Sequence, residues 1–192
     1  MENLKTSFIS EKTGSVITAE GRLSYAQHLF TPNPEAKTKK GDAKFTLSIL
    51  LPPDSDLTAM KKAAQDAINA KWPVGSTSRP KNPKSPFLDA GEKAGAAFDG
   101  WTLIRVSTTR RPGVIEADGK PAAQEDVYSG RWARLSLNAA AFEVDGNKGV
   151  SFFLNNVQML RHDDPIGGGA PKATSDFEVV TTNTTDPESL FG

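Results

Sequence analysis

Apolar and polar residues alternate in several short stretches of the chain, and this alternation predicts a mainly β protein. In KFTLSILLP, Phe45, Leu47 and Ile49 fall on one face before Pro52 ends the strand. The same pattern occurs in GSVITAEGRLSYA, WTLIRVSTT, VYSGRWARLSLN and KGVSFFLNNVQML. The tripeptide DGN at 145–147 is a turn signal between the last two of these strands.

One stretch, SDLTAMKKAAQDAINAKW, has the 3.6-residue period of an amphipathic helix. Ser55 or Asp56 can cap its start, and Pro73 ends it. The predicted apolar stripe consists of Leu57, Met60, Ala64, Ala67 and Ile68. About five strands, one helix and long, Pro-rich loops favour an OB-fold, a five-stranded Greek-key barrel. A β-sandwich is the alternative, but it would need more strands at even spacing.

The strand VYSGRWARLSLN has two faces of different character. Its apolar face is formed by Val127, Ala133, Leu135 and Leu137. Its other face carries Tyr128, Trp132, Arg134, Ser136 and Asn138. Aromatic and cationic side chains on a face that meets water are a candidate binding surface, although they could also cover a second small core or a helix end.

Composition excludes several classes of site. The chain has 192 residues and no cysteine, so disulfides, thiolate zinc sites and cysteine nucleophiles are excluded. No apolar run approaches the ~20 residues of a membrane span. The first residues, MENLKTSFISEKTG, lack the apolar region of a secretory signal. We therefore expect a soluble intracellular protein that does not bind membranes.

The net charge of zero hides an uneven distribution. Residues 173–192 contain four acids and no Lys or Arg, which leaves 19 acids against 23 basic residues in 1–172. We predict a basic OB-fold domain over 1–172 and a disordered acidic tail over 173–192. Asp186, Glu188 and Phe191 of the tail could mimic DNA phosphate or dock on a partner, unless the segment is a frayed terminus without a role.

Candidate catalytic patterns are weak. The two histidines, His28 and His162, stand in no metal-ligand spacing, and GGG at 167–169 lacks the context of a phosphate-binding loop. HDDP at 162–165 is expected to be a polar turn. A metal-dependent nuclease that uses Asp163 and Asp164 is a further alternative. We expect no enzyme activity, no cofactor and no metal.

Nucleic acid fits the sequence better. Proteins that bind single strands use aromatic rings for base stacking and cations along the phosphates. The predicted DNA-binding residues are Tyr128, Trp132, Arg134, Arg105, Lys44, Arg110 and Arg111. Trp72 and Trp101 flank a helix end and a strand start, and we expect both in the core.

Three segments carry a resemblance to a known family. They are GRLSYAQHLFTP, FDGWTLIRVSTTRRPGVIE and the stretch from DVYSGRWARLSLN to RHDDPIGGG. They resemble phage and prophage OB-fold single-stranded-DNA-binding proteins, formerly a domain of unknown function. These are related in plan to podovirus-type proteins whose acidic tail ends in an aromatic residue. Tyr128, Gly130 and 147–149 match the family pattern, whereas Trp132, Phe142 and the final Gly192 depart from it.

The resemblance implies a phage protein that coats single-stranded DNA in the cytoplasm of the infected bacterium during replication, recombination or repair. It implies recruitment of phage or host replication and recombination proteins through the tail, and a homodimer. A non-catalytic protein-interaction module of the replisome or virion is the alternative, in which the aromatic face would contact protein.

Overall fold

Five strands form a closed ring of pairings in the computed structural model, which describes residues 3–167. The ring strands are β3 (Gly21–Ser24), β5 (Ala43–Leu51), β7 (Thr102–Thr108), β9 (Trp132–Val144) and β10 (Asn147–Arg161). β3 pairs with β5, β5 with β7, β7 in parallel with β10, β10 with β9, and β9 returns to β3. This closure is that of a five-stranded OB barrel, so the predicted OB-fold is confirmed and the β-sandwich is not.

Shorter elements extend this barrel. The additional strands are β1 (Phe8–Ile9), β2 (Val16–Ile17), β4 (Asn33–Lys37), β6 (Leu88–Asp89) and β8 (Gly113–Ile115). The helices are α1 (Thr58–Lys71), α2 (Ala90–Ala94) and the 3-10 turns η1 (Ala26–His28), η2 (Ala96–Phe98) and η3 (Gln124–Asp126). β1 and β2 continue the sheet beyond β9, while β8 pairs in parallel with β10.

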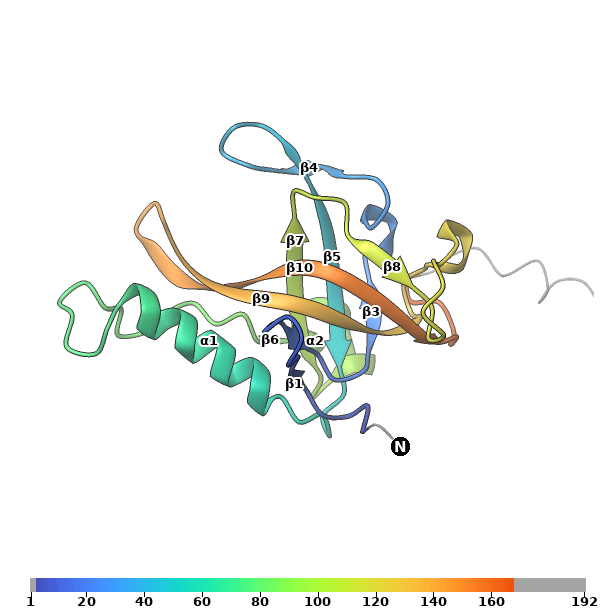
Figure 1. The fold of residues 1–192 in the computed structure, drawn as a ribbon, viewed down its shortest axis with the longest axis horizontal. Coiled ribbons are helices and arrows are strands. Elements are labelled where there is room, and N and C mark those ends of the chain that lie inside the picture. Colours follow the sequence, from blue (N-terminus) through green and yellow to red (C-terminus); the bar gives the residue numbers. More distant parts are fainter. Residues whose placement is uncertain (1–2, 168–192) are drawn as a thin grey trace, which may run out of the picture.

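The long β9–β10 hairpin crosses in front of β5, β7 and β3 (Figure 1). Asp145 and Gly146 form its turn with φ of 49° and 77°, which confirms the predicted turn. A register shift between Leu154 and Asn156 marks a bulge in β10. The bulge changes which residues face inward, so that Phe152 and Leu154 before it, and Val157 and Met159 after it, all lie in the core.

Helix α1 packs against β9 and covers one end of the barrel (Figure 1). Met60 and Ala64 are buried, and Leu57 and Ile68 pack against the same core, as the predicted stripe requires. Asp56 Oδ1 accepts a hydrogen bond from the backbone N of Thr58 at 2.9 Å, which satisfies one free donor at the helix start.

Three predicted boundaries are corrected by the structure. One of the long, Pro-rich segments that the sequence predicts as loops, residues 74–100, contains β6, α2 and η2, which bury Ala90 and Phe98 in a second small core. The predicted strand from Val127 begins only at Trp132, so Tyr128 lies in the preceding loop. The strand expected over 15–25 is interrupted, and forms β2 and β3.

Arg131 is a charged residue inside the predicted apolar face, and it is only 3% exposed. Its guanidinium pairs with the Glu116 carboxylate and also donates to the Asp126 carbonyl at 2.8 Å. A buried cation needs such a partner, and Glu116 provides it from the loop after β8. Trp72 and Trp101 lie where the sequence predicts them, in the core. Trp72 is buried, and Trp101 packs against the second small core.

Candidate nucleic-acid interface

An open groove of about 830 Å³ lies over the outer face of β5 and β7, between η1, β4 and β10. Strand alternation determines which β5 side chains form the floor of the groove. Phe45, Leu47 and Ile49 point into the core, whereas Lys44, Thr46 and Ser48 point outward into the groove. The register pairs Ser48 with Arg105, so this arginine stands on the same floor. Lys44 and Arg105, both predicted from the sequence, are therefore brought together here.

Two smaller hollows continue this groove past the end of β7. One is lined by Lys44, Ser107, Arg110, Asn138 and Phe153, among others. The next, about 430 Å³ in volume, shares Arg110 and Asn138 with it and adds Arg111. We call the resulting surface the cationic track, defined by Lys44, Arg105, Arg110 and Arg111 together with the aromatic residues Tyr25 and Phe153.

The charges of the track are left open to an anionic ligand. Within residues 3–167, Lys44, Arg105 and Arg110 form no ion pair, and both arginines are exposed. Arg111 is positioned by the ring of Phe30, whose centroid lies 5.6 Å from its guanidinium carbon. Glu35 is the one carboxylate among the described residues that line these three hollows.

Two exposed aromatic rings accompany these cations. Phe153 is 44% exposed and lines the hollow that contains Lys44 and Arg110. Tyr25 is 59% exposed and lines the main groove. The φ of Tyr25 is 57°, a left-handed conformation that is uncommon for a non-glycine residue and is often found at functional positions.

Neither of these rings is predicted from the sequence as a binding residue. A signal for Phe153 exists, because it follows the inward-facing Phe152 in an alternating strand and must therefore point outward. Tyr25 has no such signal, since it sits between a strand and a 3-10 turn rather than within a periodic element.

Arg134 lies on the outer face of β9, beyond the track. Its Nε donates to Gln158 Oε1 at 2.7 Å, on the neighbouring strand β10. It lines an adjoining, more apolar hollow together with Phe8 and Ile115. The structure therefore places Arg134 on the same sheet face as Asn138, two side-chain rows away from the track.

Trp132 lies at the opposite end of the hairpin from the β9–β10 turn, and its ring is already in contact with other side chains. Its Nε1 donates to Asp163 Oδ2 at 2.7 Å, and the Arg161 guanidinium carbon lies 4.0 Å from its ring centroid. The Trp101 ring is 6.2 Å away, at a tilt of 47°. These contacts hold the segment after β10 against the start of β9.

Tyr128 joins the same cluster. Its hydroxyl donates to the Asp163 carbonyl at 3.0 Å, and its ring stacks on His162 with centroids 5.9 Å apart. Gly130 (φ 111°) packs so closely that a Cβ there would lie 2.3 Å from the Asp164 carbonyl oxygen. We call Tyr128, Trp132, Arg161 and Asp163 the exit cluster, because they fix the chain where it leaves the barrel.

Several predictions fall outside this geometry. Asp186, Glu188 and Phe191 lie outside the described residues. Asp163 belongs to the exit cluster, and no three His, Asp, Glu or Cys side chains within 3–167 gather where they could hold a metal ion. None of the helices in this part of the chain is long and apolar enough to cross a membrane.

The family model for the Enterobacter phage Enc34 ssDNA-binding protein matches residues 14–190. The solved single-stranded DNA-binding protein from bacteriophage Enc34 is 22% identical, with a TM-score of 0.66 over 92% of this chain and 96% of that one. The structure of that protein in complex with ssDNA is 20% identical, with a TM-score of 0.68 over 87% of this chain and 97% of that one. The chain is also similar to gp2.5, a single-stranded DNA binding protein encoded by bacteriophage T7. The sequence identity is 14% and the TM-score 0.58, over 77% of this chain and 92% of that one. No curated protein sequence matches the chain.

The exit cluster predicts a specific pH dependence of stability. The Trp132 N–H bond, then the backbone N–H of Asp164 and the charges of Arg22 and Arg161, lower the pKa of the Asp163 carboxyl. A carboxyl with a lowered folded-state pKa stabilises the fold above its ordinary value of about 3.9, and this contribution is lost as the pH falls through the folded-state pKa. Trp132→Phe keeps an aromatic side chain but removes the indole N–H.

We expect Trp132→Phe to lower the thermal midpoint at pH 7, and the difference from the unmodified protein to shrink towards pH 2.5, as followed by circular dichroism. Trp101→Phe is the control, because its indole is not bonded to Asp163 and its effect should not depend on pH in this range. A Trp132→Phe difference of equal size at both pH values would contradict the assignment.

Proposed function

The chain belongs to the family of Enterobacter phage Enc34 ssDNA-binding proteins, and on that basis we propose that it binds single-stranded DNA along the cationic track without catalysing a reaction. The observation that carries this proposal is the convergence of four cations and two exposed rings on one continuous surface. None of those cations forms an ion pair within residues 3–167.

Each part of the track has a chemical role in this proposal. Lys44, Arg105, Arg110 and Arg111 contact phosphates, which carry no sequence information. Tyr25 and Phe153 offer faces on which bases stack, and stacking contributes about 1–3 kcal/mol per base. Every base has such a face, so the track would bind single strands with little sequence preference. Double-stranded DNA keeps its bases paired and stacked, and so could not use the two rings.

The predicted roles of Tyr128 and Trp132 change under this proposal. Their rings and polar atoms are occupied within the exit cluster. We therefore assign base stacking to Tyr25 and Phe153, and a structural role to Tyr128 and Trp132. Arg134 stays a candidate phosphate contact at the far end of the same sheet face.

Salt dependence tests the phosphate contacts. For single strands, log affinity falls with log salt at a slope of about −0.7 for each phosphate neutralised. Arg105→Ala should weaken oligo-dT binding severalfold at low salt and make the slope shallower by about 0.7, as measured by fluorescence anisotropy over a salt series. The matched control is Lys62→Ala, which removes a cation from α1 away from the track.

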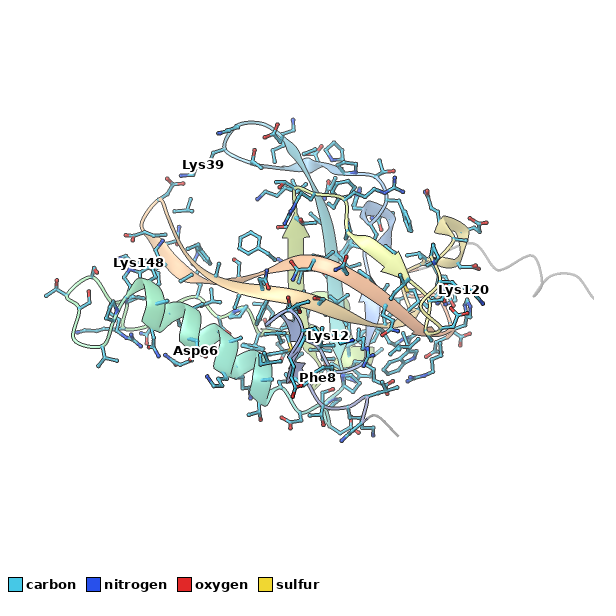
Figure 2. The ribbon with its side chains drawn as sticks, viewed as in Figure 1. Phe8, Lys12, Lys39, Asp66, Lys120 and Lys148 are labelled. Atoms are coloured by element: carbon cyan, nitrogen blue, oxygen red, sulfur yellow. The ribbon has the colours of Figure 1, made fainter. Side chains whose placement is uncertain are left out.

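Lys62 pairs with Asp66, which Figure 2 places on α1. The control should therefore leave the slope unchanged. A slope for Arg105→Ala equal to that of Lys62→Ala would remove Arg105 from the interface. Failure of the unmodified protein to bind oligo-dT at low salt would contradict the function itself.

We further propose that residues 173–192 form a tail separate from the domain over 1–172. Their four acids and lack of basic residues support competition with DNA for the track, and Phe191 supports docking on replication or recombination proteins. In this proposal the protein works in the cytoplasm of the infected bacterium during replication, recombination or repair, as a homodimer.

Removal of residues 173–192 tests the tail. We expect tighter oligo-dT binding and a steeper salt slope, because four competing negative charges are lost. The same titration with Asp186→Asn and Glu188→Gln together should give part of this gain. Unchanged or weaker binding after truncation would contradict competition by the tail.

A further inference from the structure

The outer face of the β9–β10 hairpin continues beyond the cationic track. Along β9, alternate residues Asn138, Ser136 and Arg134 share this face, and they span about 14 Å at about 3.4 Å per residue. Opposite them on β10, the register places Phe153, Asn156 and Gln158. Asn138 lines two hollows of the track. The next two rows of side chains, Ser136 with Asn156 and Arg134 with Gln158, therefore lead away from it.

These rows end in an apolar hollow of about 230 Å³ between the edge strands β1 and β8. The pairings align one residue from each of four neighbouring strands in a single row, namely Phe8, Ile17, Ser136 and Asn156. Ile115 of β8 stands beside Gln158 in the next row. Phe8 is 38% exposed and Ile115 37% exposed, so both apolar side chains are open to solvent.

The hollow is continuous with the track rather than isolated from it. It shares Ser136 and Asn156 with the hollow that contains Arg110 and Arg111. A strand of DNA whose phosphates follow these two arginines would therefore arrive at the hollow without leaving the surface. Figure 2 shows Phe8 on the near side of the molecule, below the hairpin.

The chemistry of the hollow matches that of a nucleobase. A base has apolar faces and a polar, hydrogen-bonding edge. The hollow offers apolar surface on Phe8, Ile17 and Ile115, and hydrogen-bonding groups on Ser136 and Asn156. The Asn156 amide oxygen accepts from the backbone N of Gly113 at 3.1 Å, which fixes its orientation and leaves its NH₂ group as a donor.

We propose that single-stranded DNA extends from the cationic track across the outer face of β9 and β10, and that one base occupies the hollow against Phe8. This inference rests on the proposed function, because the same strand of DNA must first bind the track. It makes the binding site longer than the barrel groove. Affinity should then depend on Phe8 only when the oligonucleotide is long enough to reach it.

The test compares two lengths of oligo-dT, about 6 and about 16 nucleotides, within the range of site sizes that OB-folds cover. Phe8→Ala should weaken binding of the longer oligonucleotide at least fivefold, as expected for loss of one stacked base, and leave the shorter one unchanged. Fluorescence anisotropy with the full chain gives both affinities. The control is Ile9→Ala, the adjacent exposed residue on β1, whose side chain leaves the sheet on the opposite side.

A second variant, Phe8→Leu, keeps an apolar side chain at the edge of the sheet but removes the ring, and a thermal melt verifies the fold of each variant. It should show the same length-dependent loss. Equal affinities for Phe8→Ala and the unmodified protein at both lengths, or equal losses at both, would overturn the inference. A changed elution volume without a change in DNA affinity would also overturn it, because it would assign the hollow to a protein contact.

The same measurements distinguish failure of the proposed function from failure of the extension to Phe8. If the unmodified protein does not bind the shorter oligonucleotide at low salt, binding by the track itself is contradicted. If it binds both lengths and Phe8→Ala does not distinguish them, only the extension to Phe8 is contradicted.

Discussion

The pairing of β9 with β10 is the constraint on which the rest of the molecule depends. The two strands have 13 and 15 residues, and their inner face supplies Leu135, Phe152 and Val157 to the core that closes the barrel. A one-residue slip would exchange the two faces of a strand. The bulge after Leu154 absorbs one extra residue, so the inner face stays apolar on both sides of it. The outer face is then free to carry polar and aromatic groups.

The middle of this hairpin and its open end have different roles. Near the bulge, Phe153 and Asn138 meet the cations that β5 and the end of β7 supply. At the open end, opposite the β9–β10 turn, Trp132 and Asp163 fix the chain as it leaves β10. Both parts carry aromatic side chains on the outer face of the hairpin, which explains why the sequence alone does not separate a binding residue from a structural one. The difference lies in whether a long-range partner occupies the side chain.

Local pattern predicts the parts of this structure that depend on near neighbours. Alternation identifies β5, β7, β9 and β10, and the 3.6-residue period identifies α1. The short elements β8 and α2 are missed, because three and five residues give too little periodicity. Contacts between distant residues, such as Tyr128 with Asp163 and Arg131 with Glu116, have no local signature. The track cations Lys44, Arg105, Arg110 and Arg111 are identified by residue type and position, yet their convergence follows from long-range strand pairing. The antiparallel register of β5 with β7 places Lys44 and Arg105 on one face, and the parallel pairing of β7 with β10 places Phe153 beside them.

Photochemical cross-linking of oligo-dT to the full chain, with the modified residues identified by mass spectrometry, tests the central claim most directly. The claim is that bases stack on the rings of the cationic track while the exit cluster keeps its own rings occupied. The account predicts thymine adducts on Tyr25 and Phe153, and none on Trp132. Adducts concentrated on Trp132 and Tyr128, with Tyr25 and Phe153 unmodified, would contradict it.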